Sequence, residues 1–181
     1  PKKSCLFVPI RDVVFCIKPK SGKKINSFGT RGFINTGIVR AAPVVWQDKL
    51  IVASLDSLKI KAFNLPSGNF AWEIPIHPIN KNFKGGTPWG GISLDSQRSL
   101  LFVSTGNPRP ALYGGSREGN NKNSNSIIAF DLINQNIKWS FQEVAHDLWD
   151  YDIASPPLLT SIKINDKIID VVIVMTKIGN T

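Results

Sequence analysis

Short apolar runs alternate with turn residues along the whole chain. The runs with the length and the Val, Ile, Leu and Phe content of β-strands cover residues 6–10, 13–17, 49–54, 58–63, 100–104, 126–131, 137–141 and 168–176. Within residues 58–62 apolar and polar side chains alternate, as expected for a strand with one buried face. No stretch of a dozen residues shows the 3.6-residue apolar period of a helix. The pattern predicts an all-β protein built from antiparallel hairpins.

An eleven-residue pattern occurs twice in the chain. Residues 62–72 read Ala-Phe-Asn-Leu-Pro-Ser-Gly-Asn-Phe-Ala-Trp, and residues 129–139 read Ala-Phe-Asp-Leu-Ile-Asn-Gln-Asn-Ile-Lys-Trp; a weaker copy without the tryptophan begins at Cys16. Repeats of about 40–50 residues with four strands each are typical of β-propeller blades, and the wider gap before the last copy indicates an insertion. We therefore expect part of a β-propeller, with about three to four blades of four antiparallel strands.

The composition is that of a globular protein. Of the 181 residues, 42% are hydrophobic and 19% are charged. The longest apolar run, residues 171–175, is far shorter than the roughly 20 residues of a membrane-spanning helix. A propeller closes into a ring to protect its strand edges, and a few blades alone would leave edges bare. We therefore expect residues 1–181 to be a partial propeller domain, a fragment of a longer polypeptide.

The chain is basic, with 22 Lys and Arg residues against 13 Asp and Glu residues and a net charge of +9. Such an excess could indicate nucleic-acid binding, for which basic residues gather on one face. Here they are scattered among turns, apart from a group between residues 2 and 24. A basic surface that binds no nucleic acid is the favoured interpretation.

The two cysteines, Cys5 and Cys16, form no motif typical of zinc or covalent haem binding. If residues 6–9 pair with residues 14–17 across a turn at Arg11 and Asp12, Cys5 lies opposite Lys18 and not opposite Cys16. This register does not favour a disulfide.

Between residues 85 and 177 the chain carries an ordered series of motifs. They are Gly-Thr-Pro-Trp-Gly-Gly (86–91), Ser-Thr-Gly-Asn-Pro (104–108), Tyr-Gly-Gly (113–115), Trp-Ser-Phe-Gln-Glu (139–143), His-Asp-Leu-Trp-Asp-Tyr-Asp (146–152) and Thr-Lys (176–177). Their order and spacing resemble the dehydrogenases that depend on pyrroloquinoline quinone (PQQ), the quinoproteins that oxidise alcohols or aldose sugars on an eight-bladed propeller. The eleven-residue repeat resembles this family's tryptophan-docking motif. The motifs are most similar to the membrane glucose dehydrogenase branch, and the adjacent cysteine pair of methanol dehydrogenases is absent.

The resemblance assigns roles to residues that have ordinary structural interpretations as well. Trp89 stands among glycines, which would let the backbone approach a flat ligand. Without the resemblance, Trp89 would be interpreted as a core residue. It matches the PQQ-stacking tryptophan of the family. Asn107 is typical of a turn, yet it matches a Ca²⁺ ligand, for which an amide oxygen is suited. Asp56 is expected as a further carboxylate ligand of the metal. Ser54 and Arg40 fall near family positions that hold the PQQ carboxylates.

Three carboxylates lie within the motif at residues 146–152. Asp147 and Asp152 are interpreted as parts of a solvated acidic loop. Asp150 stands between two aromatic residues, whose walls could exclude water and raise its pKa; it matches the family's catalytic base and is also expected at the metal. Lys177 ends the last predicted strand, and it matches the lysine that contacts the quinone oxygens. His146 could contact substrate, but packing is the favoured interpretation.

The resemblance implies an enzyme that passes a hydride from an alcohol or aldose sugar to Ca²⁺-bound PQQ. Electrons would then pass to ubiquinone or to a cytochrome c. It also implies a periplasmic location, compatible with anchoring to the inner membrane through segments outside residues 1–181. The alternative is a non-catalytic propeller scaffold of the outer-membrane assembly lipoprotein type. Such a scaffold would not need Trp89, Asn107, Asp150 and Lys177 together.

Overall fold

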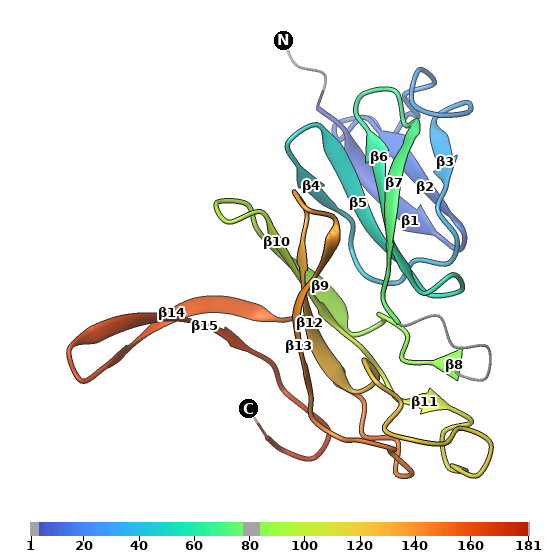
Figure 1. Cartoon of the computed structure of the whole chain (residues 1–181). Helices are drawn as coiled ribbons and strands as arrows, with labels where there is room; N and C mark the ends of the chain where they lie inside the picture. Colours follow the sequence, from blue (N-terminus) through green and yellow to red (C-terminus); the bar gives the residue numbers. More distant parts are fainter. Residues whose placement is uncertain (1–3, 78–83, 181) are drawn as a thin grey trace. The chain divides into compact units, whose positions relative to one another are not determined.

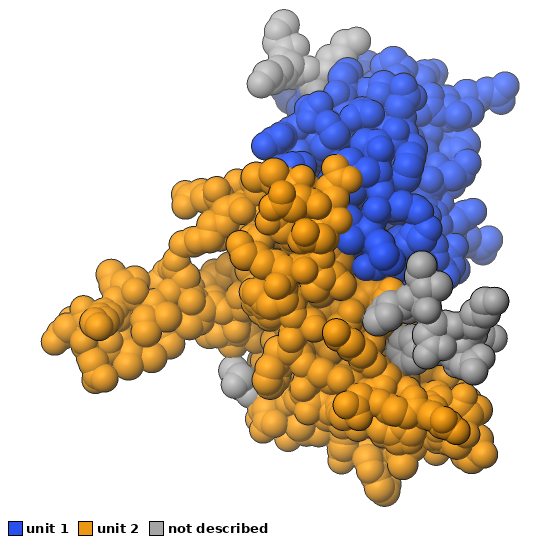
Figure 2. Space-filling view, in the orientation of Figure 1, with its two compact units in different colours: residues 1–75 blue, residues 76–181 orange. Residues whose placement is uncertain are grey.

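The computed structural model describes residues 4–77 and 84–180, and every helix or strand assigned in them is a β-strand. The chain divides into two compact units, Pro1–Pro75 and Ile76–Thr181, which Figure 2 colours separately and which are described here one at a time. Within the described residues there is no helix long and apolar enough to cross a membrane.

The first unit holds two antiparallel sheets (Figure 1). A three-stranded sheet has the order β1-β2-β3, and a four-stranded meander has the order β4-β5-β6-β7. Their bounds are β1 (Leu6–Ile10), β2 (Val13–Ile17), β3 (Phe33–Asn35), β4 (Val44–Trp46), β5 (Lys49–Ser54), β6 (Lys59–Asn64) and β7 (Phe70–Pro75). One buried cluster joins the two sheets, with Val14 and Ile34 from the first packed against Leu50, Val52 and Phe63 from the second.

The second unit is built on a four-stranded antiparallel sheet of order β13-β12-β10-β9. A short ribbon pairs β11 with β8, and β14 pairs with β15 in a hairpin that projects from the unit (Figure 1). The bounds are β8 (Lys84–Gly85), β9 (Gly91–Asp95), β10 (Leu100–Ser104), β11 (Pro108–Arg109), β12 (Ser126–Asp131), β13 (Asn136–Gln142), β14 (Leu158–Ile164) and β15 (Lys167–Ile173). Leu159 and Val172 of the hairpin pack on Leu100, Phe102 and Ala129 of the sheet.

The two copies of the eleven-residue pattern adopt the same local structure. In the first copy Trp72 lies opposite Ala62, and in the second Trp139 lies opposite Ala129. A register shift follows each alanine, before the next phenylalanine. Both alanines are fully buried, so each is closely packed opposite its tryptophan. The repeat is therefore a blade unit, as the sequence predicted.

Most of the predicted strands are present, and several match to the residue, such as 6–10, 49–54 and 126–131. The strand predicted at residues 168–176 is wrong at its far end, because pairing stops at Ile173 and Lys177 lies in a later turn. The strand β14, which pairs with β15, was not predicted. The sequence of β14, Leu-Leu-Thr-Ser-Ile-Lys-Ile, mixes polar with apolar residues, and most of these residues are exposed.

The prediction that Cys5 and Cys16 do not pair is wrong. The register is the expected one, with Phe7 opposite Cys16 and Leu6 opposite Ile17. However, Cys5 lies two residues from Phe7 and so points to the same sheet face as Cys16, on a diagonal. The Cα atoms are 5.6 Å apart, within the range that a disulfide spans, and the two cysteines are bonded.

Candidate cofactor site in the second unit

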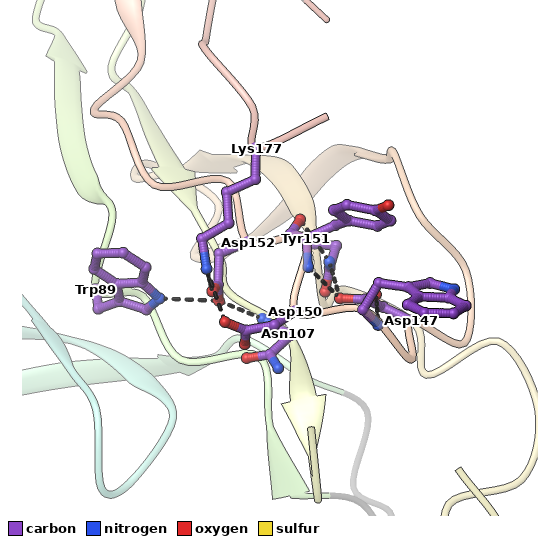
Figure 3. A network of polar contacts seen from close by, with 9 residues as sticks. Trp89, Asn107, Asp147, Asp150, Tyr151, Asp152 and Lys177 are labelled. Carbon is purple, nitrogen blue, oxygen red and sulfur yellow. Dashed lines mark hydrogen bonds and ion pairs between the residues drawn. The ribbon is translucent and has the colours of Figure 1, made fainter. Parts of the chain in front are cut away.

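Four loops of the second unit carry the residues that the motifs singled out (Figure 3). Trp89 precedes β9, Asn107 lies between β10 and β11, Asp150 follows β13 by several residues, and Lys177 lies in the turn after β15. Although these residues are far apart in the sequence, one network of hydrogen bonds connects the loops. Its centre is Asp152, to which the sequence analysis had assigned no role.

The Asp152 carboxylate is buried, with 4% of the residue exposed. Its Oδ1 accepts hydrogen bonds from the backbone N–H of Asn107 at 2.8 Å and from the indole Nε1–H of Trp89 at 3.2 Å. Its Oδ2 accepts one from Lys177 Nζ at 2.5 Å. Burial acts to raise the pKa of Asp152, but the bonds from Lys177, Asn107 and Trp89 outweigh it and lower the pKa below its usual value. The carboxylate is thus held ionised inside the loop cluster.

Lys177 bridges two carboxylates that differ in exposure. Besides Asp152, its Nζ donates to Asp150 Oδ2 at 2.9 Å. The side chains of Lys177 and Asp150 are 38% and 45% exposed, against 6% for Asp152. Burial acts to lower the pKa of Lys177, but its hydrogen bonds to Asp152 and Asp150 outweigh this and raise the pKa. The lysine is therefore a fixed cation with one buried and one accessible partner.

The interpretation of Asp147 and Asp152 as solvated residues is wrong. Asp147 is 1% exposed, and its carboxylate accepts hydrogen bonds from Trp149 N at 2.8 Å, Tyr151 N at 2.7 Å and Asn125 Nδ2 at 2.8 Å. These bonds fold residues 147–151 around the carboxylate. The short polar segment thus closes on itself instead of extending into water.

The expected aromatic walls around Asp150 are also absent. Trp149 is 73% exposed, and the Asp150 side chain is itself 45% exposed, so water is not excluded from this carboxylate. Asp150 itself adopts a left-handed backbone conformation, with φ of 63°. Among the described residues its Oδ2 is paired with Lys177 and its Oδ1 has no partner.

Arg117, which the sequence analysis missed, ties this loop to the segment before β12. It is 2% exposed, and its guanidinium donates to the backbone carbonyls of Pro110, Ala111 and Asp147 and to Asn121 Oδ1. A buried arginine whose donors are used on backbone oxygens has a structural role. No local sequence signal distinguishes it from a solvated arginine.

The glycines near Trp89 serve packing. A Cβ on Gly90 would meet the carbonyl oxygen of Ile153, and one on Gly91 would lie 2.8 Å from the Pro156 side chain. A side chain at either position would therefore collide with Ile153 or Pro156. Gly106 is different, because a Cβ there would collide with Asp152 Oδ1 and lie 2.5 Å from Trp89 Nε1. The Thr-Gly-Asn motif thus needs glycine so that Trp89 can reach Asp152.

The remaining predicted residues lie in the first unit. Ser54 is fully buried, and its hydroxyl donates to Asp56 Oδ1 at 2.7 Å. The same oxygen accepts from Ile38 N at 3.1 Å and Ser57 N at 2.9 Å. Burial acts to raise the pKa of Asp56, but these hydrogen bonds lower it. Arg40 is exposed and has no ion-pair partner among the described residues. The assignment of all three to cofactor or metal binding stays a prediction.

The second unit offers a partial oxygen set for a hard cation. In Figure 3 the side chains of Asn107 and Asp150 extend toward the same region. Asn107 is 3% exposed, and its Nδ2 has no hydrogen-bond partner within residues 4–77 and 84–180. The described residues contain no cluster of three His, Cys, Asp or Glu side chains able to enclose a metal. An amide and a carboxylate suit Ca²⁺, but its six to eight oxygens would need further donors.

Comparison with known proteins places the chain in a family. Quinoprotein glucose dehydrogenase from Escherichia coli K12 is 25% identical over 97% of this chain, and quinoprotein glucose dehydrogenase A from Acinetobacter calcoaceticus is 26% identical over 99% of it. In each case the chain spans only 26% of the relative's length. The crystal structure of quinohemoprotein alcohol dehydrogenase from Comamonas testosteroni superposes with a TM-score of 0.76 at 23% identity, covering 96% of this chain and 31% of that one.

These structural likenesses identify the fold as part of a β-propeller, in agreement with the blade units seen here. The family model for the PQQ glucose/ethanol/alcohol dehydrogenase β-propeller domain matches residues 2–181, nearly the whole chain. The resemblance to this family found in the motifs is thereby confirmed, and quinoprotein glucose dehydrogenases are among the relatives. The chain belongs to the PQQ-dependent glucose, ethanol and alcohol dehydrogenase propeller family.

Proposed function

We propose that the protein containing this chain is a PQQ-dependent dehydrogenase that oxidises an alcohol or an aldose sugar. Family membership supports the reaction class. The observation that carries the proposal is the Lys177 ammonium, which joins a buried carboxylate, Asp152, to an accessible one, Asp150, beside Trp89. A fixed cation, an accessible base and an aromatic ring on one loop cluster are the parts that oxidation of a bound alcohol requires.

Asp150 is the proposed general base. Of the three carboxylates in its loop, Asp147 and Asp152 are buried and their oxygens are used by donors of the protein. Asp150 is 45% exposed, and its Oδ1 has no partner among the described residues. A substrate hydroxyl could therefore reach this oxygen and give up its proton there, while the substrate carbon loses a hydride.

Trp89 and Lys177 are the proposed cofactor contacts of the second unit. The hydrogen bond from the Trp89 indole to Asp152 fixes the orientation of the ring, which could then stack on a planar ligand. The Lys177 ammonium would hold the quinone oxygens. When bound, PQQ supplies the acceptor for the hydride. Arg40 and Ser54 are the proposed contacts for its carboxylates.

Asn107 and Asp150 are the proposed Ca²⁺ ligands of the second unit, and Asp56 is a further candidate in the first. Their amide and carboxylate oxygens are the donors that this ion prefers. We propose ubiquinone or a cytochrome c as electron acceptor and the periplasm as location. The Cys5–Cys16 disulfide supports an oxidising compartment.

The test uses the full-length protein, prepared without cofactor and reconstituted with PQQ and Ca²⁺. Wild type should oxidise an alcohol or an aldose in a dye-linked assay. Asp150→Asn should lose turnover by a factor of about 10²–10⁴ while PQQ still binds, because the amide cannot accept the proton. Asparagine tolerates the left-handed conformation at this position, so the loop should keep its shape.

Asn107→Ala is the matched variant for the metal. It should weaken Ca²⁺ binding, and excess Ca²⁺ should restore part of its activity but none of the activity of Asp150→Asn. Near-normal turnover by Asp150→Asn would remove Asp150 from the role of base. A wild-type protein that binds no PQQ would refute the proposed function and favour a scaffold.

A further inference from the structure

We propose that Asp152 is the positioning residue of this site: its buried carboxylate holds the Lys177 ammonium and the Trp89 indole in the arrangement that cofactor binding needs. This inference rests on the proposed function, because it assigns the hub of the network a task in that site. Asp152 itself would contact neither substrate nor cofactor. Its oxygens are already occupied by donors from the protein.

The first argument is the origin of those donors. Trp89, Asn107 and Lys177 are 63, 45 and 25 residues away from Asp152 in the sequence and lie on separate loops. The backbone N–H of Asn107 binds Oδ1 through a buried hydrogen bond of 2.8 Å. The carboxylate is therefore anchored independently of the two side chains that it holds. A single buried anion sets the position of both groups.

The second argument is the difference between the two partners of Lys177. A lysine side chain has about four rotatable bonds and loses much conformational freedom when it is held in place. Asp150 is too accessible to hold it alone, because an exposed ion pair contributes little. Asp152 keeps the ammonium in place when the bond to Asp150 opens.

The third argument is the space that the chain reserves for the contact with Trp89. At Gly106 any side chain would occupy the volume in which Trp89 Nε1 meets Asp152 Oδ1. The backbone of Gly106 has an ordinary φ, so the conformation itself does not demand glycine. The missing side chain serves the contact between the indole and the carboxylate.

The test separates the two arms of the network in the full-length protein. In Asp152→Asn the amide oxygen can still accept from Trp89 and Asn107, while the amide N–H₂ faces the Lys177 ammonium. This variant should release Lys177 and leave the indole in place. Asp152→Ala should release both side chains, and Gly106→Ala should force Trp89 Nε1 and Asp152 Oδ1 apart, because the added Cβ would lie against both atoms. Asp166→Asn, on the exposed turn between β14 and β15, is the control.

The first readout needs no cofactor. In protein labelled with 5-fluorotryptophan, the fluorine resonance of Trp89 is assigned by its loss in Trp89→Phe. We expect Asp152→Ala and Gly106→Ala to move this resonance, and Asp166→Asn to leave it unchanged. An unmoved resonance in both Asp152→Ala and Gly106→Ala would overturn the role of Asp152 toward Trp89.

The second readout is PQQ binding. It is measured as the dissociation constant of PQQ and as turnover at saturating PQQ. Asp152→Asn should raise the dissociation constant about tenfold or more, the effect of losing a hydrogen bond between charged groups, and should lower turnover as well. Wild-type affinity and turnover in Asp152→Asn, with only a lower unfolding midpoint, would overturn the positioning role. Full restoration by excess Ca²⁺ would also overturn it, because Asp152 would then act as a metal ligand.

The experiments distinguish a failure of the proposed function from a failure of the positioning role of Asp152. If wild type binds no PQQ but the Trp89 resonance moves as expected, the network exists and the dehydrogenase assignment is wrong. If wild type binds PQQ and Asp152→Asn behaves like Asp166→Asn, the dehydrogenase assignment stands and Asp152 has no positioning role.

Discussion

The carboxylate of Asp147 should hold the loop at residues 147–151 closed, and its removal tests this directly. Asp147→Ala deletes an acceptor that binds two backbone N–H groups, those of Trp149 and Tyr151, and the side-chain amide of Asn125. The two backbone groups are near the surface and can turn to water, so each bond accounts for about 1 kcal/mol. Asn125 is fully buried; its Nδ2 also donates to the Tyr151 carbonyl oxygen at 2.8 Å, so one of its two N–H groups would lose its partner, which adds about 1–3 kcal/mol.

The sum predicts that Asp147→Ala lowers the free energy of unfolding by about 3 kcal/mol, part of the loss being offset because a buried anion is removed. The assay is urea unfolding of the full-length protein, followed by tryptophan fluorescence. The control is Asp12→Ala, since Asp12 is exposed in the turn between β1 and β2 and its carboxylate has no partner among the described residues. The control should stay within about 0.5 kcal/mol of wild type.

Turnover is the second measurement on the same variants. Asp150 and Asp152 follow Asp147 on the same loop, so Asp147→Ala should lower turnover even at urea concentrations where the protein remains folded. If Asp147→Ala unfolds at the same urea concentration as Asp12→Ala, the carboxylate does not organise the loop and the reasoning is refuted.

Three further predictions concern other parts of the fold. Burial lowers the pKa of His77, so the unfolded chain binds its proton more readily and stability should fall as the pH drops below 6.5; His77→Gln should flatten that part of a stability-against-pH curve. Ala129→Val should lower the free energy of unfolding by about 1–3 kcal/mol in urea, because the fully buried alanine leaves no space beside the blade tryptophan. Cys5 and Cys16 should resist alkylation in unfolded protein until a reductant is added, which mass spectrometry would detect.

The fold was predictable because its main signals are local. Strands such as β5, β10 and β12 are continuous apolar runs whose limits are set by turn residues on each side. Several of the missed strands are short or exposed: β14 is mostly exposed, and β8 and β11 have two residues each and pair with one another. A segment of two residues carries no periodicity of its own, and its strand character comes from the partner. β9 was missed although it has five residues and none of them is exposed.

The disulfide shows how a correct register can lead to a wrong conclusion. When only directly opposite residues are considered, a disulfide between Cys5 and Cys16 is not favoured. In a pleated sheet, however, side chains two positions apart share a face, and a diagonal pair can come as close as 5.6 Å between Cα atoms. The error was in the geometry considered and not in the sequence signal.

The three aspartates at 147, 150 and 152 mark the limit of what a sequence of this kind reveals about a site. They have the same side chain within six residues, yet Asp147 and Asp152 are buried and Asp150 is accessible. Which carboxylate is buried depends on donors from distant positions, such as Trp89 and Lys177 for Asp152. The local sequence shows that three carboxylates are present, but it does not show which hydrogen-bond donors each of them will meet. The family motif favours Asp150 as the base, which stays a prediction, and the folded chain shows that donors of the protein already occupy the other two carboxylates.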